Sequence, residues 1–194
     1  MFLRNLDKYE ILLGSKSPRR RELLQMLRIP FSVANITNVE EVYPDSLPAH
    51  DVPQYLSGIK ADAYLERLKH NELIITADTV VVLDNKIYGK PRDIKHAVEM
   101  LMELSGKTHQ VVTGVTIATH HQRTSFTTET DVTFSPLTED EARYYAESYN
   151  PTDKAGAYGI QEWIGGIAVE EIRGSFYNVM GLPIHRLYQH LKNF

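Results

Sequence analysis

The 194-residue chain contains no cysteine, which excludes a disulfide framework and a thiolate metal site. Basic residues are not in excess either. The 21 Lys and Arg residues are outnumbered by 25 Asp and Glu residues, which gives a formal net charge of −4. Because a dedicated nucleic-acid binder usually carries a basic excess, we expect no nucleic-acid partner.

Long apolar runs are also absent from the sequence. The longest run, "LIITADTVVVL", is too short to span a bilayer and is interrupted by Asp78, so we expect no membrane association. The first residues, "MFLRNLDKYEILL", are charged and lack the apolar core of a secretory signal peptide. These features together predict a cytoplasmic protein, with a length that suits one domain.

Hydrophobic periodicity and capping residues predict a mixture of helices and strands. Helices are expected at 18–28, 52–70, 94–105, 138–148 and 183–191. Strands are expected at 10–13, 31–35, 73–83, 108–119, 122–134 and 167–174, with Asp84-Asn85 as a hairpin turn. Residues 35–50 and the glycine-rich stretch 154–166 are expected to be loops. This order, without strict alternation, indicates a mixed α/β or α+β sheet with helices against it.

The stretch "GSKSPRRRELL" begins a predicted helix, with Ser17 as the N-cap and Pro18 at the first helical position. Its first turn carries arginines at positions 19 to 21. The helix N-terminus already bears a partial positive charge, so each arginine there costs about 0.3–1 kcal/mol. Either this is a solvated basic turn, or the helix N-terminus and the guanidinium groups bind an anion such as phosphate.

Asp78 interrupts an apolar segment. An unpaired carboxylate in such surroundings costs several kcal/mol, so it requires a cation, a metal or hydrogen bonds. Two interpretations remain open from the pattern alone. Asp78 caps a turn between two short strands, or it is a general base or metal-linked carboxylate in a cleft.

Other polar residues have equally open interpretations. Taken singly, Lys60 and Lys90 are typical of solvated surface lysines, although Lys90 lies in the turn "YGKP", from which it could reach a cleft. Glu40 and Glu41 could contribute to a magnesium site, because Mg²⁺ takes carboxylate and phosphate oxygens. The Gln161 amide offers a donor and an acceptor that could recognise a base edge, or it faces solvent.

Six segments in order, "SKSPRRRELL", "ITADTVV", "GKPRD", "LSGKTHQVVTGV", "DKAGAYGIQ" and "GSFYNVMGLP", together resemble the Maf family of nucleoside triphosphate pyrophosphatases. The resemblance covers nearly the whole chain. It implies a single Maf-like domain over 1–194, with a mixed α/β fold related to the inosine-triphosphate pyrophosphatases. That fold has a long twisted sheet with flanking helices and two lobes around a cleft.

The resemblance also implies hydrolysis between the α- and β-phosphates with a divalent cation, Mg²⁺ or Mn²⁺. Asp78 matches the catalytic acidic residue of the family, and its role as general base or as metal ligand stays open. Glu41 matches a loop acid and joins Asp78 in the expected metal site. The positions that match substrate-binding residues are Ser15, Arg19, Arg20, Lys60, Thr79, Lys90 and Gln161.

Within the family, we expect dTTP and UTP to be the substrates and the role to be house-cleaning of the nucleotide pool. Neutral donors and acceptors at Thr79 and Gln161 suit the edge of uracil or thymine. Glu162 and Trp163 depart from the glycine-led loop of some members, which keeps 7-methyl-GTP pyrophosphatase as an alternative. A second alternative is a non-catalytic nucleotide-binding or septum-regulating protein. A homodimer is common in the family that the chain resembles.

Overall fold

The computed structural model describes residues 3–34 and 39–194. The chain divides into two compact units. Unit 1 comprises Met1–Asp78, Thr113–Thr128 and Gly181–Phe194, and unit 2 comprises Thr79–Val112 and Glu129–Met180. The expectation of one Maf-like domain over 1–194 stays a prediction.

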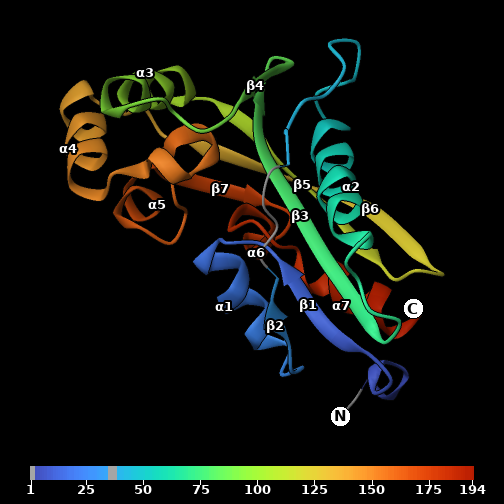
Figure 1. Ribbon diagram of the computed structural model, residues 1–194. Helices are drawn as coiled ribbons and strands as arrows, with labels where there is room; N and C mark the ends of the chain where they lie inside the picture. Colours follow the sequence, from blue (N-terminus) through green and yellow to red (C-terminus); the bar gives the residue numbers. More distant parts are fainter. Residues whose placement is uncertain (1–2, 35–38) are drawn as a thin grey trace. The chain divides into compact units, whose positions relative to one another are not determined.

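The helices and strands follow the chain as drawn in Figure 1. Unit 1 holds η1 (Arg4–Leu6), β1 (Glu10–Gly14), α1 (Pro18–Met26), β2 (Ser32–Val33), α2 (Val52–Leu65) and α7 (Ile184–Lys192). Unit 2 holds β4 (Lys86–Tyr88), α3 (Ile94–Leu104), α4 (Glu139–Tyr149), η2 (Pro151–Asp153), η3 (Ala155–Ala157), α5 (Trp163–Ala168), β7 (Val169–Arg173) and α6 (Phe176–Val179). The long strands β3 (Glu72–Leu83), β5 (Thr108–Ala118) and β6 (Arg123–Phe134) contribute residues to both units.

In the described residues, seven strands form one mixed sheet in the order β2-β1-β3-β5-β6-β7, with β4 paired to β3. Strand β1 runs parallel to β2 and to β3, whereas β4 is antiparallel to β3 and β7 is antiparallel to β6. The predicted mixed α/β sheet with helices against it is confirmed.

The core of unit 1 forms where α2 packs on the sheet. Strand β3 is buried along its length in this unit, which explains the apolar run Leu73–Ile75 and requires partners for the buried Glu72, Thr76 and Asp78. Gly114 on β5 permits a close approach by α2, because a Cβ added there would lie 2.1 Å from the backbone nitrogen of Gln54. Apolar contacts among Leu12, Ala61 and Ile74 hold the same helix on the sheet.

The core of unit 2 is built around α3 and α4, which lie side by side (Figure 1). Both helices begin at a residue whose side chain caps the helix N-terminus. The Asp93 side chain accepts a hydrogen bond from the backbone of His96, and Thr138 forms a capping box with Glu141. Tyr145 on α4 and Phe134 on β6 are fully buried in this core. Both helices therefore lie where the sequence predicts them, within one residue at each end.

Local turn chemistry also behaves as predicted at the hairpin between β3 and β4. Asp84 and Asn85 have φ angles of 50° and 64°, the left-handed conformation that a two-residue hairpin turn needs. The predicted helix 52–70 is shorter than expected and ends at Leu65. Residues 35–38 of the predicted loop 35–50 lie outside the described residues.

The glycine-rich segment 154–166 differs from the prediction of a loop. It contains η3 and the start of α5, so β7 begins at Val169 and not at Ile167. Glycine disfavours a helix by about 1 kcal/mol per residue, so a tertiary contact decides here. The Trp163 ring packs edge-on against Tyr144 of α4, with ring centroids 5.0 Å apart. The short helix α6 was also not predicted.

No helix in the described part of the chain has the length and apolar character needed to cross a bilayer.

Candidate active site

The predicted catalytic carboxylate is placed by polar contacts between α2 and β3 in unit 1. Thr76 and Asp78 lie on the same face of β3, because side chains two residues apart share a face. Thr76 donates to the Ser57 carbonyl at 2.7 Å, and the Ser57 hydroxyl lies 2.9 Å from that of Thr116. One turn further along α2, Lys60 Nζ lies 2.6 Å from Asp78 Oδ1. The buried hydroxyl contacts thus fix α2 where its lysine meets the aspartate.

A second carboxylate joins this pair. Glu41 Oε1 lies 3.0 Å from the same Lys60 nitrogen. The side chains of Lys60 and Asp78 are 13% and 12% exposed, and that of Glu41 is 50% exposed. The need of Asp78 for a cation is therefore met by an ion pair. The interpretation of Lys60 as a solvated surface lysine is wrong, because its ammonium is largely buried between two carboxylates.

Arg20 anchors the backbone next to Asp78. Its Nη1 donates to the Ala77 carbonyl and its Nε to the Gly181 carbonyl, each at 2.8 Å. Burial lowers the pKa of the Arg20 guanidinium, and the nearby charge of Asp78 opposes that shift. The two carbonyls therefore offset part of the electrostatic cost of placing an arginine in the first turn of a helix. This part of the cost is offset without a bound anion.

The loop before α1 is shaped by two serine hydroxyls. The Ser17 side chain accepts from the Arg20 backbone at 3.5 Å, as expected for an N-cap, and Ser15 Oγ accepts from the Ser17 backbone at 3.2 Å. Arg19 is half-buried and its charge adds to the lowering of the Arg20 pKa, whereas Arg21 is exposed. Of the three arginines in this turn, Arg21 is therefore the one that faces solvent.

The remaining predicted substrate residues belong to unit 2. Thr79 is half-buried at the start of this unit on β3, while Lys90 and Gln161 are exposed. The turn that carries Lys90 is tied to η3 by a hydrogen bond from the Gly156 backbone to the Gly89 carbonyl at 3.1 Å. Exposed side chains on anchored turns suit ligand contact, and their roles stay predictions.

Sequence reasoning missed a buried lysine in unit 2. The Lys154 side chain is only 9% exposed, and its ammonium lies 2.8 Å from Asp153 Oδ1 and 3.2 Å from Glu162 Oε1. The sequence feature that could have indicated this burial is the position of the lysine inside "DKAGAYG". The small residues of this stretch leave room for close packing around the lysine. Glu162 also accepts a hydrogen bond from the Tyr145 hydroxyl. Glu162 and Trp163 therefore both contact α4, through Tyr145 and Tyr144 respectively.

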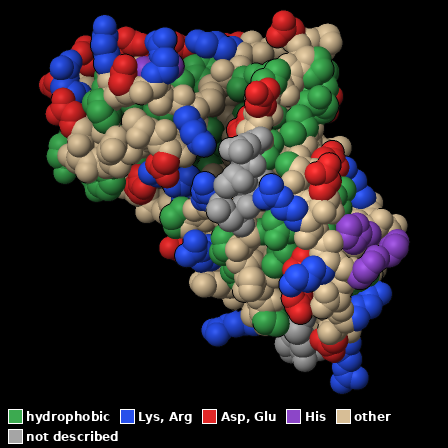
Figure 2. Space-filling model, viewed as in Figure 1, with side chains coloured by type: hydrophobic (Ala, Val, Ile, Leu, Met, Phe, Trp, Pro, Cys, Tyr) green, Lys and Arg blue, Asp and Glu red, His purple; other side chains and the backbone are tan. Residues whose placement is uncertain are grey.

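The described residues contain no cluster of three or more His, Asp or Glu side chains arranged to hold a metal. Figure 2 shows histidine side chains gathered on one part of the surface. His70, His120 and His121 of unit 1 do pack together, with ring centroids 5.4 to 6.5 Å apart. The donor chemistry suited to Mg²⁺ or Mn²⁺ lies instead at Glu41 and Asp78. Two converging carboxylates fit such an ion when substrate phosphates supply further oxygens.

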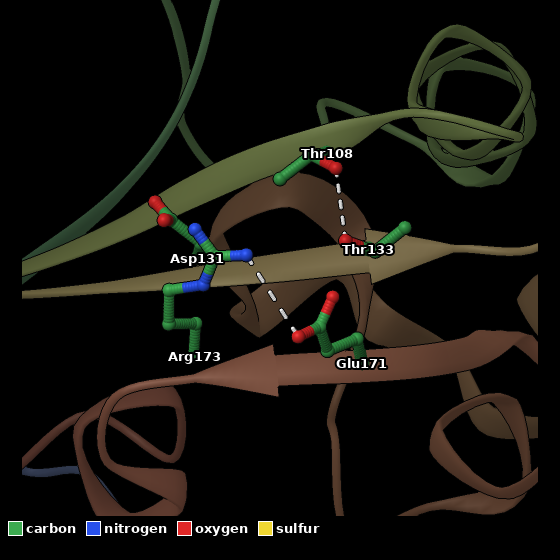
Figure 3. A pocket seen from close by; sticks show the side chains of 5 residues that line it. All are labelled: Thr108, Asp131, Thr133, Glu171 and Arg173. Carbon is green, nitrogen blue, oxygen red and sulfur yellow. Dashed lines mark hydrogen bonds and ion pairs between the residues drawn. The ribbon is translucent and has the colours of Figure 1, made fainter.

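A hollow of about 180 Å³ lies over β5, β6 and β7 in unit 2 (Figure 3). It is lined by Thr108, Asp131, Thr133, Glu171 and Arg173. The two threonine hydroxyls lie 2.8 Å apart, and Arg173 lies 3.9 Å from Glu171. The hollow is smaller than ligand pockets of about 300–1,000 Å³, its lining is polar, and it contains none of the predicted site residues.

The family model described as Maf-like protein matches residues 10–194. The chain belongs to the Maf family. A relative from Bacteroides thetaiotaomicron named dTTP/UTP pyrophosphatase is 54% identical over 190 residues, which is 98% of each chain. A relative of the same name from Porphyromonas gingivalis is 52% identical over 194 residues, covering 99% of this chain and 98% of its own.

Solved structures resemble this Maf chain at low sequence identity. The Staphylococcus aureus Ham1 protein has a TM-score of 0.57 at 16% identity and covers 95% of this chain and 98% of its own. A HAM1 protein from Coxiella burnetii has a TM-score of 0.53 at 13% identity. The match covers 96% of this chain and 100% of the Coxiella burnetii chain. These likenesses confirm the predicted mixed α/β fold, related to that of the inosine-triphosphate pyrophosphatases, and say nothing of the substrate of the Maf chain.

Proposed function

We propose that this Maf chain is a nucleoside triphosphate pyrophosphatase that hydrolyses dTTP and UTP to the monophosphate and pyrophosphate. The convergence of Asp78 and Glu41 on the Lys60 ammonium carries the proposal. The names of relatives that are 52–54% identical over nearly the whole chain support the choice of reaction and of substrate.

The reaction requires a water molecule to attack the α-phosphorus while pyrophosphate leaves. Asp78 is held at a fixed place by Lys60 and can orient the water or accept its proton. The Lys60 ammonium pairs with two carboxylates. When substrate binds, triphosphate oxygens compete with these carboxylates for the ammonium. The Arg20 guanidinium is fixed by two carbonyls and adds a preorganised positive charge.

Glu41 and Asp78 are the residues that we propose to hold a divalent cation, Mg²⁺ or Mn²⁺. When bound, the cation supplies charge neutralisation at the phosphate oxygens. Both carboxylates already contact one ammonium, and an oxygen-preferring cation uses the same donor atoms. Treatment with EDTA should abolish turnover, and addition of Mg²⁺ or Mn²⁺ should restore it. Full activity in EDTA would contradict the metal proposal and leave the hydrolase proposal standing.

Ser15, Arg19, Thr79, Lys90 and Gln161 are proposed to complete the substrate contacts, with phosphate at the cationic residues and the base at Thr79 and Gln161. A cytoplasmic location suits an enzyme that removes nucleotides from the cellular pool. A homodimer is the proposed assembly, and light scattering during gel filtration measures it directly.

The position of bond cleavage tests the proposal. Hydrolysis of dTTP in H₂¹⁸O should give dTMP and pyrophosphate in equal amounts, with the label in dTMP, because water attacks the α-phosphorus. Chromatography with mass spectrometry measures both products. Formation of dTDP and free phosphate, or label in pyrophosphate, would contradict it. A dTTP-binding protein without turnover would support the non-catalytic alternative.

A further inference from the structure

Gln161 lies in a tight turn of unit 2. The backbone N–H of Glu162 donates to the Gly159 carbonyl at 2.9 Å, which closes a four-residue turn with Gln161 at its third position. Ile160 is buried and Gln161 is exposed. The direction of the Gln161 side chain therefore depends on how firmly the two ends of this turn are held.

One buried hydroxyl holds both ends. The Tyr145 hydroxyl accepts from the Gly159 backbone N–H at 3.0 Å and donates to the Glu162 carboxylate. Tyr145 is fully buried on α4 and is therefore a rigid anchor. Burial and the adjacent Glu162 raise the pKa of Tyr145 far above its usual value, so the hydroxyl keeps its proton.

Packing and charge hold the carboxylate in place. A Cβ added at Gly159 would lie 2.8 Å from the carboxyl carbon of Glu162, so this carboxylate lies directly over the glycine. The Lys154 ammonium lies 3.2 Å from the other carboxylate oxygen and is itself largely buried. Glu162 is thus fixed by a phenol on one oxygen and an ammonium on the other.

We infer that Tyr145 and Glu162 are positioning residues that fix the turn carrying Gln161 and, through it, the choice of base. This inference rests on the proposed function, in which Gln161 contacts the base. Neither residue needs to touch the substrate. A substrate whose base matches the Gln161 amide depends on the turn, whereas a mismatched base does not gain that contact.

The Tyr145→Phe variant removes the hydroxyl and keeps the ring. We expect kcat/KM for dTTP to fall by about 10- to 10²-fold, mainly through KM, as expected for a misplaced binding group. The ratio of kcat/KM for dTTP to that for CTP should fall by a similar factor. Tyr144→Phe is the matched control, because it keeps the ring that packs on Trp163. Tyr144→Phe should change kcat/KM for dTTP and kcat/KM for CTP by less than about twofold each.

Glu162→Gln provides a second variant in case Tyr145→Phe does not fold. It keeps an acceptor for the Tyr145 hydroxyl and loses the ion pair with Lys154, so we expect a smaller change in the same direction. An unchanged dTTP-to-CTP ratio in folded variants would overturn the inference, even if both activities fell. Hydrogen exchange gives an independent measurement. The amides of 159–162 should exchange faster in Tyr145→Phe than in wild type or Tyr144→Phe.

The outcomes separate the two proposals. A wild-type protein that does not hydrolyse dTTP refutes the proposed function, and hydrogen exchange then still tests whether Tyr145 fixes the turn. A wild-type protein that prefers dTTP, with a Tyr145→Phe variant indistinguishable from Tyr144→Phe, refutes the positioning role alone.

Discussion

The Lys60 ammonium binds Asp78 Oδ1 at 2.6 Å, and both side chains are largely buried. The pair joins α2 to β3 across 18 residues of sequence. Burying a single charge costs several kcal/mol, whereas a hydrogen-bonded pair offsets much of that cost. Asp78 is thereby held in a fixed position within a buried strand, which suits a catalytic base or a metal ligand.

Replacement of Asp78 by Asn should abolish most of the activity. The amide keeps the size of the side chain and can still accept a hydrogen bond from Lys60, so we expect the fold to remain. Turnover of dTTP should fall by at least about 10²-fold, the lower end for loss of a general base. Steady-state pyrophosphate release measures the rate, and circular dichroism checks the fold.

Arg21→Ala is the control for that experiment, because Arg21 is exposed on α1. It should retain activity within about twofold of wild type. A folded Asp78→Asn variant with near-normal turnover would reduce Asp78 to a structural partner of Lys60.

Replacement of Lys60 by Met should destabilise the protein, because Asp78 then loses its closest cation. We expect a loss of about 1–3 kcal/mol in the free energy of unfolding, measured by urea denaturation. The double variant Lys60→Met with Asp78→Asn should recover part of this loss, since the largely buried carboxylate of Asp78 is then also removed and only the half-exposed Glu41 loses its partner. Losses that simply add in the double variant would show that the pair contributes no coupling energy.

Buried His109 predicts a dependence of stability on pH. Burial lowers its pKa from 6.5 to about 4, and its Nε2 lies 2.8 Å from the Tyr158 hydroxyl. Between these two pH values the unfolded chain binds a proton that the folded chain does not, so stability falls as pH falls from about 6.5 to 4. The full effect is about 3 kcal/mol.

The His109→Gln variant should flatten this part of the stability profile, because glutamine can hydrogen-bond Tyr158 but does not titrate. His185→Gln on the exposed side of α7 should leave the profile as in wild type. Urea denaturation at several pH values between 4 and 7 measures the slope. A slope unchanged by His109→Gln would assign the acid sensitivity to other groups.

The sequence predicted those parts of the fold that local chemistry determines. Residues close together in the sequence determine these parts. They are the helix caps at Asp93 and Thr138, the hairpin turn at Asp84-Asn85 and the apolar run of β3. The segment 163–168 could not be assigned in this way. Its glycines disfavour a helix, and the Trp163–Tyr144 contact that supports it joins positions far apart in the sequence.

The contacts of the candidate site could not be predicted from the sequence. The position of Asp78 in an apolar run required a cation, a metal or hydrogen bonds, yet nothing local indicated that Lys60 pairs with it. The arginines of the first helical turn were expected either to face solvent or to bind an anion, whereas Arg20 binds the carbonyls of Ala77 and Gly181. The Tyr145–Glu162 contact was missed for the same reason, because long-range pairing is not encoded in residue spacing.

The choice of base is the remaining prediction, and it follows from what Glu162 and Trp163 contact. A 7-methylguanine base is cationic, so its pocket should offer an aromatic face and an acidic group. In this chain the acidic residue and the aromatic residue that follow Gln161 already contact other side chains of the protein. Glu162 binds Tyr145 and Lys154, and Trp163 packs against Tyr144. We propose that the neutral side chain of Gln161 contacts the base.

We therefore expect kcat/KM for dTTP and UTP to exceed that for 7-methyl-GTP by at least about 10²-fold, with CTP and GTP also poor substrates. The donor and acceptor of an amide match the edge of thymine or uracil, and a mismatched base leaves those groups unpaired. Competition assays with all five triphosphates measure these ratios. A preference for 7-methyl-GTP would require Glu162 to leave Tyr145 and Lys154 when substrate binds. That result would overturn the assignment of the base. It would not contradict the prediction that pyrophosphate is released.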